Sequence, residues 1–327
     1  MKQQLTNNHN IPLLLSAWLL SDEYDYIHDP NYLSVTSLMR PIQEIVLSPR
    51  AVAMATTQEL DISDRIASAL GNSVHNAVER VWTNKELLVK SLIQLGYEPE
   101  DIDNIEVNPQ LQLLDPTKEQ VYIEQRAFKK LEGFTIGGKF DAVLGGIVHD
   151  IKTTSVWTWI KSARDEDYRL QGSIYRWLNQ DKITEDYIRV CFLFTDWQKG
   201  MVGTVEGYPT ARCAYKDVEL MSIEETERWV RNRLRQIKNL RDAPAEDMPP
   251  CSDEEVWLEK PVYKYYSNPM KTDGRATKNF SDHSEAVAHL QEKGKGIILS
   301  SPPKAKKCRD YCNAFLACKQ KDSYDFD

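Results

Sequence analysis

Apolar positions along the chain indicate both helices and strands. Over residues 64–82, 168–178 and 224–241 they recur every three or four residues, which predicts three amphipathic helices. Short runs rich in β-branched and aromatic residues predict strands over residues 121–124, 138–144, 148–154 and 188–194, with residues 203–208 and 213–218 at the sheet edge. This mixture predicts an α/β fold in which helices flank a central mixed sheet.

One pair of predicted strands carries the most informative residues. A Gly-Gly turn at 145–146 separates them, which is typical of a β-hairpin, so Asp141 is expected to return beside Asp150. Because residues i and i+2 of a strand share a face, Asp150 and Lys152 should point the same way while Ile151 enters the core. Two carboxylates and an ammonium group together suit chemistry on phosphate with bound Mg²⁺ or Mn²⁺. A surface hairpin with an ordinary Asp–Lys pair would show the same pattern.

The residues Asp141 and Asp150-Ile151-Lys152, with Glu124 on an earlier strand, resemble the PD-(D/E)XK nuclease superfamily, specifically its RecB-like branch. The resemblance implies a restriction-endonuclease-like core. It implies that Asp141, Asp150 and the backbone carbonyl of Ile151 are metal ligands. It further implies that Lys152 acts on the attacking water, either as a base or as an electrostatic clamp. For Glu124 it implies a supporting role behind the metal or beside a second one.

Two helical patterns extend this resemblance. Gln171 and Tyr175 lie four residues apart, so they share a helix face, and a Q-x-x-x-Y helix is implied to pack over the site and orient the catalytic residues. Alternatively, Tyr175 is a core aromatic and Gln171 a helix-boundary residue. Gly71 and His75 match a G-x-x-x-H helix whose histidine is implied to be an extra metal ligand, which would favour Mn²⁺ over Mg²⁺. His75 is otherwise an ordinary histidine at the edge of an apolar stripe.

Four of the six cysteines lie late in the chain: Cys251, Cys308, Cys312 and Cys318. Closely spaced thiols in a chain with no recognisable signal peptide favour a metal site over disulfides. This cluster resembles the iron–sulfur staple of some RecB-like nucleases, which implies a [4Fe–4S] cluster. A four-thiolate Zn²⁺ site and free thiols are the alternatives. Cys251 is assigned as the fourth ligand only from its position after Pro249-Pro250.

The chain is expected to form three parts. These are an N-terminal segment over residues 1–30, a nuclease core over residues 31–245 and a small α+β module over residues 246–327 that the metal cluster staples. Within the module, strands are predicted over residues 262–266 and 297–299, and a helix is predicted to begin at Asp282 with Glu285 as its capping partner.

The most apolar stretch, residues 11–20, is too short to cross a membrane and lacks a small-residue cleavage site. An amphipathic or buried N-terminal helix is therefore expected there. We expect a cytoplasmic protein without a membrane partner, in the host cytoplasm if the chain is phage-encoded.

The formal net charge of −8 argues against broad nonspecific DNA binding, so local basic patches must supply any attraction to a polyanion. Two candidate DNA-binding patches are predicted. One is a helix face with Arg228, Arg231 and Arg235, and the other is a loop with Lys304, Lys306 and Lys307. Ordinary solvated charges are the alternative for both.

These patterns predict a metal-dependent deoxyribonuclease that hydrolyses phosphodiester bonds. The resemblance favours an exonuclease acting on DNA ends in phage recombination or replication. DNA ends or single strands, and phage recombination or single-strand-binding proteins, are the expected partners. A structure-selective endonuclease, a catalytically silent DNA-end-binding subunit, and an interaction protein organised around its cysteines are the alternatives.

Overall fold

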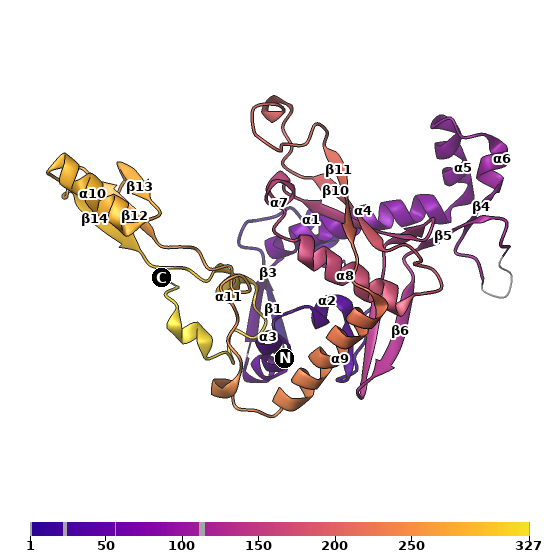
Figure 1. The fold of residues 1–327 in the computed structure, drawn as a ribbon, viewed down its shortest axis with the longest axis horizontal. Coiled ribbons are helices and arrows are strands. Elements are labelled where there is room, and N and C mark those ends of the chain that lie inside the picture. The colour runs from indigo at the N-terminus through magenta and orange to yellow at the C-terminus, as the bar shows by residue number, and fades with distance from the viewer. Residues whose placement is uncertain (1, 22–24, 56, 111–114, 327) are drawn as a thin grey trace. The chain divides into compact units, whose positions relative to one another are not determined.

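The computed structural model of the 327-residue chain describes residues 2–21, 25–55, 57–110 and 115–326. They form two compact units, and Figure 1 labels many of their elements. The first unit consists of residues 2–39 and 57–235, and the second consists of residues 40–56 and 236–327. Each unit therefore joins segments that are distant in the sequence. The predicted boundaries after residues 30 and 245 stay a prediction.

A six-stranded mixed sheet forms the centre of the first unit, in the order β11-β10-β9-β8-β5-β4. Its strands are β4 (Ile105–Val107), β5 (Glu119–Ile123), β8 (Ala142–Leu144), β9 (Ile147–Thr154), β10 (Tyr187–Phe194) and β11 (Cys213–Glu219). The β9–β10 and β4–β5 pairs are parallel, and the other three pairs are antiparallel. The prediction of an α/β fold with a central mixed sheet flanked by helices is confirmed.

Two smaller sheets complete the strands of this unit. One is β2 (Tyr32–Ser34), β7 (Phe134–Lys139) and β6 (Arg126–Leu131), and the other is β1 (Lys2–Thr6) with β3 (Thr57–Asp61). The helices are α1 (Leu13–Leu20), α2 (Val35–Leu38), α4 (Ile66–Thr83), α5 (Lys85–Gln94), α6 (Pro99–Asp103), α7 (Val156–Lys161) and α8 (Asp165–Leu178), with short 3-10 turns η1 (Ile62–Arg65) and η3 (Lys199–Met201). Helix α9 (Ile223–Leu240) crosses the boundary between the units.

Helices α8 and α4 both pack against β9. On the α8 side, a Cβ atom added to Gly172 would lie 2.9 Å from Ile188 of the neighbouring strand, so the helix approaches the sheet closely. On the α4 side, Gly71 faces Thr153. Because alternate residues of a strand point to opposite faces, α8 covers the face that carries Asp150 and α4 covers the face that carries Thr153.

The chain bends where an antiparallel pair of segments passes from one sheet to another. Strand β5 continues through Glu124 and Gln125 into β6, and β7 continues through Phe140 and Asp141 into β8. At the bend, the amide of Glu124 donates to the carbonyl of Asp141 at 2.9 Å, and the amide of Phe140 donates to the carbonyl of Gln125 at 3.1 Å. The single strand predicted over residues 138–144 is therefore wrong, because the bend interrupts it between β7 and β8.

The predicted hairpin between β8 and β9 is confirmed. Leu144 pairs with Ile147, so the loop contains Gly145 and Gly146 alone. Their φ values are 54° and 75°, which is the left-handed backbone that a two-residue type I′ turn requires.

Two details of the predicted sheet are wrong. Asp150, at 2% exposure, lies on the more buried face of β9, whereas Ile151 is only half-buried. Helices cover both faces, so strand alternation alone does not tell which face is deeper. The strand predicted over residues 203–208 is absent from this described segment, because Gly203 and Gly207 adopt positive φ values of 76° and 71° in a series of turns.

The second unit contains helix α3 (Ile42–Met54), which packs against the C-terminal segment. Its residues Val46, Leu47 and Ala51 share a core with Met248, Ala314, Ala317 and Cys318. The strands and the helix predicted within residues 262–299 are present, as the antiparallel sheet β13-β12-β14 with helix α10 (His283–Lys293). Its strands are β12 (Val262–Tyr266), β13 (Lys278–Phe280) and β14 (Ile297–Ser301). The remaining elements are η4 (Ala245–Asp247), α11 (Lys306–Tyr311) and η5 (Gln320–Ser323).

The predicted cap of the module helix is confirmed, because the Asp282 side chain accepts a hydrogen bond from the amide of Glu285 at 3.1 Å. The predicted N-terminal helix is also present as α1. An amphipathic or buried helix was expected, and burial is mostly wrong, since Leu19 is buried while Leu13 and Leu14 are 85% and 83% exposed. Within the described residues, no helix combines the length and apolar character needed to cross a bilayer.

The close packing of α8 on β7 gives a test of the fold. A Cβ atom on Gly138 would lie 2.7 Å from Val35 and 3.0 Å from the Tyr175 ring. We expect Gly138→Ala to lower the free energy of unfolding by about 1–3 kcal/mol, because neighbouring side chains must shift. The matched control is Gly274→Ala, which has nothing within 4 Å of the new atom. Denaturant titration of both variants measures the difference, and equal stabilities would contradict this packing.

Candidate active site

The bend between the two sheets carries two of the predicted site acids. Asp141 directly precedes β8, and Glu124 lies between β5 and β6. Glu124 has a φ of 52°, which non-glycine residues adopt rarely and which is enriched at functional sites. This unusual backbone conformation therefore occurs at the residue whose carboxylate lies next to Asp141.

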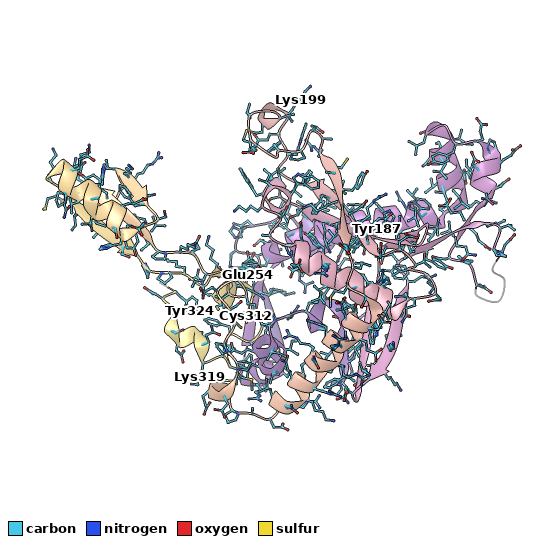
Figure 2. The ribbon with its side chains drawn as sticks, in the orientation of Figure 1. Tyr187, Lys199, Glu254, Cys312, Lys319 and Tyr324 are labelled. Atoms are coloured by element: carbon cyan, nitrogen blue, oxygen red, sulfur yellow. The ribbon has the colours of Figure 1, made fainter. Side chains whose placement is uncertain are left out.

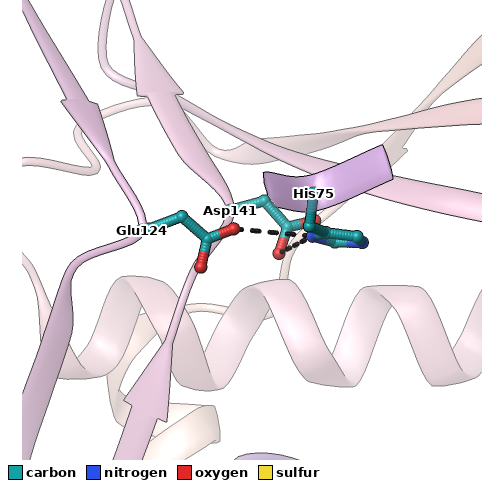
Figure 3. A group of neighbouring side chains, drawn as sticks. All are labelled: His75, Glu124 and Asp141. Atoms are coloured by element: carbon teal, nitrogen blue, oxygen red, sulfur yellow. Dashed lines mark ion pairs between the residues drawn. The ribbon is translucent and has the colours of Figure 1, made fainter. Parts of the chain in front are cut away.

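His75 of α4 faces both acids. Its Nδ1 atom lies 3.3 Å from Oδ1 of Asp141 and 3.5 Å from Oε1 of Glu124. Dashed lines mark these ion pairs in Figure 3. Hydrogen bonding to Asp141 and then to Glu124 raises the pKa of His75 to about 10, against the opposing effect of burial. In the absence of a metal, the imidazole is thus a cation bridging two carboxylates, which means that this position favours positive charge.

Asp150 and Lys152 form the second part of the site on β9. The Nζ atom of Lys152 lies 2.7 Å from Oδ2 of Asp150. Burial raises the pKa of Asp150, while the charge of Lys152 opposes this effect. Burial lowers the pKa of Lys152, but the charges of Asp150 and then Asp141 outweigh it and leave that pKa raised. The raised pKa keeps Lys152 an ammonium ion, which suits an electrostatic clamp better than a base.

Gln171 and Tyr175 pack over Asp150 from α8. The Nε2 atom of Gln171 donates to Oδ1 of Asp150 at 3.0 Å and to the Tyr175 hydroxyl at 3.1 Å. Both side chains are buried, so Tyr175 is a core aromatic and also a partner of the site. The arrangement fixes the orientation of the Asp150 carboxylate.

The backbone of Ile151 reaches the site through its amide, which donates to Oδ2 of Asp141 at 2.7 Å. This hydrogen bond connects the two acids of the hairpin, because Ile151 directly follows Asp150. The carbonyl of Ile151 as a metal ligand stays a prediction.

The donor atoms fit a divalent metal ion. One ligand atom each from His75, Glu124 and Asp141 lie within 4.8 Å of one another. This group has two carboxylates and one imidazole and does not include Asp150. Oδ2 of Asp150 is buried and lies 2.7 Å from the ammonium group of Lys152, which is its partner. The group of three could hold a divalent ion, and Mn²⁺ or Mg²⁺ as that ion stays a prediction.

A groove of about 1210 Å³ opens over His75, Glu124 and Asp141. It also contains two cations that the sequence reasoning missed, Arg126 and Lys139. The Nζ atom of Lys139 lies 2.7 Å from Oε2 of Glu124. In the sequence, Lys139 stands two residues before Asp141, which is a signal that it lies near the site. The sequence does not predict the bend at Phe140.

The four late cysteines gather in the second unit, where Figure 2 labels Cys312. Cys308 and Cys318 are buried, and Cys251 and Cys312 are half-buried. Burial, with the neighbouring thiols as a further cause, raises the pKa of Cys251 to about 12 and that of Cys308 to about 11. Such thiols remain protonated at neutral pH unless a metal ion takes the place of the protons.

A buried glutamine from α3 points at these thiols and was also missed by the sequence reasoning. The Sγ atoms of Cys318 and Cys251 donate to Oε1 of Gln43 at 3.1 and 3.6 Å. Gln43 precedes Cys251 by 208 residues, so no local pattern connects them.

Among the described residues, the three-ligand groups within 4.8 Å do not include the cysteines, so the choice between a [4Fe–4S] cluster and a zinc ion stays a prediction.

The predicted DNA-binding residues are mostly engaged in ion pairs. On α9, Arg231 lies 2.9 Å from Glu132 and 2.8 Å from Glu227, and Arg235 lies 3.1 Å from Glu132, whereas Arg228 is exposed. In the loop, Lys306 pairs with Glu259 at 2.7 Å, Lys307 pairs with buried Glu44 at 3.2 Å, and Lys304 is exposed. Their role in DNA binding stays a prediction.

Comparisons with known proteins add little to this geometry. No protein-family model and no curated protein matches the sequence. A crystal structure of SSO0001 aligns with a TM-score of 0.41 and 16% sequence identity, covering 71% of this chain and 87% of that one. Function must therefore be inferred from the site itself.

The metal site can be tested without measuring catalysis. We expect His75→Ala to weaken Mn²⁺ binding by about tenfold or more, because it removes the nitrogen ligand from the site. Electron paramagnetic resonance of free Mn²⁺ gives the affinity, with His9→Ala, an exposed histidine, as the matched control. Equal Mn²⁺ affinity in the two variants would remove His75 from the ligand set.

Proposed function

We propose that the protein is a metal-dependent deoxyribonuclease with a PD-(D/E)XK core. The observation that carries the proposal is the convergence of Asp141, Asp150 and Lys152 on two adjacent strands, with His75 and Glu124 completing the acid cluster. Coverage of this hairpin by Gln171 and Tyr175 supports the RecB-like branch. A chance hairpin would lack this agreement among four separate elements.

Asp141, Asp150 and His75 would hold Mg²⁺ or Mn²⁺, with Glu124 as a further ligand and the Ile151 carbonyl as a predicted one. When bound, the ion supplies a Lewis acid for the phosphoryl oxygen and lowers the pKa of a water molecule.

Formal charges in the site favour a phosphodiester substrate. Glu124, Asp141 and Asp150 carry three negative charges, and Lys139 and Lys152 carry two positive charges. A divalent cation beside a neutral His75 would turn this deficit into one net positive charge, which matches the single charge of a phosphodiester.

The residues of the chain have distinct roles in this proposal. Lys152 stabilises the extra negative charge that develops on the phosphoryl group, since its ammonium form is favoured. Gln171 holds Asp150 in one orientation, and Tyr175 supports Gln171 from the helix. Asp141 is oriented by the Ile151 amide. Preorganised charges of this kind need no rearrangement during the reaction.

The second metal site is proposed to be a [4Fe–4S] cluster bound by Cys251, Cys308, Cys312 and Cys318, with Zn²⁺ as the alternative. Support comes from the gathering of all four cysteines in one unit. The cluster would fix the C-terminal segment against α3, which already shares a core with Cys318.

Exonuclease activity on DNA ends, in phage recombination or replication, is the preferred form of the activity. It rests on the resemblance of the cysteine cluster to that of iron–sulfur exonucleases. A catalytically silent end-binding subunit is disfavoured, because Lys152 and every predicted acid are present in the site.

Loss of one catalytic group should abolish cleavage. We expect Asp150→Ala and Lys152→Ala to reduce the cleavage rate by about 10²-fold or more, since each removes charge stabilisation in a dry site. The assay follows end-labelled linear DNA and closed circular DNA with Mg²⁺ or Mn²⁺. Lys182→Ala, which removes a lysine near Tyr122, is the control.

Cleavage of linear DNA alone would identify an exonuclease. Cleavage of both substrates would identify an endonuclease. Undiminished cleavage by Lys152→Ala would contradict the site assignment.

The cluster makes a separate prediction. Anaerobically purified protein should be brown, with about four iron atoms and four inorganic sulfides per chain, if the [4Fe–4S] assignment holds. Cys312→Ser should lose this iron and absorbance, while the exposed Cys213→Ser should retain both. One zinc per chain without iron would favour the alternative site, and a metal-free wild-type protein would contradict both.

A further inference from the structure

The hairpin of β6 and β7 places two cations directly opposite each other. Arg126 pairs with Lys139 in the strand register. Like charges in this position destabilise a sheet, so their retention requires compensation or a function. Each cation is compensated by an acid, Lys139 by Glu124 at 2.7 Å and Arg126 by Asp25 at 3.1 Å.

The two compensating acids differ in their exposure to solvent and in their relation to the metal-binding group. Glu124 belongs to the metal-binding group and is only 12% exposed at its side chain. Asp25 is 86% exposed at its side chain, while its partner Arg126 is only 14% exposed. The guanidinium of Arg126 also donates from both terminal nitrogens to the backbone carbonyl of Asp25 at 3.1 Å. A solvent-exposed acid thus contacts a largely buried cation on the wall of the groove.

An aromatic side chain follows the cation pair along the same wall. Phe128 is two residues from Arg126 on β6, so both side chains share a face, and both line the groove. Phe128 is 54% exposed although it is a large apolar residue. Trp18 of α1, 38% exposed, lines the same groove. Cations next to an exposed aromatic ring are typical of a site for a nucleotide, in which the cations contact the phosphate and the ring stacks on the base.

We propose that Arg126 and Lys139 form a clamp for a backbone phosphate next to the cleaved bond, and that Phe128 stacks on the base of that nucleotide. The inference rests on the proposed nuclease function, because it takes a DNA strand as the ligand of the groove. The carboxylate of Asp25 pairs with the guanidinium of Arg126 until a substrate phosphate displaces that carboxylate. The subsite positions the strand beside His75 and Asp141, which line the same groove.

The test is DNA affinity as a function of salt, with Ca²⁺ in place of the catalytic ion. The probe is a fluorescein-labelled single-stranded oligonucleotide measured by anisotropy. Each lost phosphate contact lowers the slope of log K against log salt by about 0.7 for single strands. Because the two cations hold one phosphate between them, we expect the double variant Arg126→Gln/Lys139→Gln to lower the slope by about 0.7.

Phe128→Ala should weaken binding by about tenfold while leaving the salt slope unchanged, because stacking releases no counterions. Asp25→Asn should strengthen binding by about twofold to fivefold, since it removes an exposed competitor. The control is Lys129→Gln, which removes one charge from the opposite face of β6 and should leave the slope unchanged.

The outcomes separate this inference from the proposed function. A wild-type protein that binds and cleaves DNA, with a double variant of unchanged salt slope, would overturn the phosphate clamp alone. A wild-type protein that neither binds nor cleaves DNA would overturn both. Mn²⁺ affinity and circular dichroism of the double variant establish that its fold and metal site are intact.

Discussion

Repulsion among three carboxylates is the constraint on which the structure of the site depends. Glu124, Asp141 and Asp150 converge where water is partly excluded, and unpaired charges in such surroundings are strongly unfavourable. Each carboxylate has a cationic partner. His75 bridges Glu124 and Asp141, Lys139 pairs with Glu124, and Lys152 pairs with Asp150. The raised pKa of His75 expresses the same need for positive charge. A divalent ion satisfies this need better than a proton on the imidazole.

The bend of the sheet makes this convergence possible. In an uninterrupted pair of strands, Glu124 and Asp141 would be ordinary members of one continuous hydrogen-bonded ladder. Instead, the left-handed backbone of Glu124 and the buried Phe140 redirect both strands at the same level. The bend also places Arg126 and Lys139 beside the acids, because the second sheet begins directly after it. Metal ligands and groove cations thus follow from one feature of the backbone.

Sequence alone predicts the parts of the site that depend on local rules. The glycine turn at 145–146 specifies the hairpin, and helical spacing places Gln171 and Tyr175 on one face. The β6–β7 hairpin was missed because Arg126–Leu131 lacks a regular apolar alternation, and Lys139 and Arg126 were missed with it. The contact between Gln43 and the cysteines joins residues about 200 or more positions apart, which no periodicity reveals. Burial of Asp150 rather than Ile151 depends on which helix packs closer, a tertiary property.

The most direct test of the central claim is cleavage of DNA that carries a single stereopure phosphorothioate at the scissile position, compared in Mg²⁺ and in Mn²⁺. If the acid cluster holds an ion that contacts the phosphoryl oxygen, one sulfur isomer should be cleaved slowly in Mg²⁺ and should recover in the softer Mn²⁺. Lys152→Ala should cleave neither isomer in either ion. Equal cleavage of both isomers in both ions, or cleavage without a divalent ion, would contradict a metal bound at His75, Asp141 and Asp150.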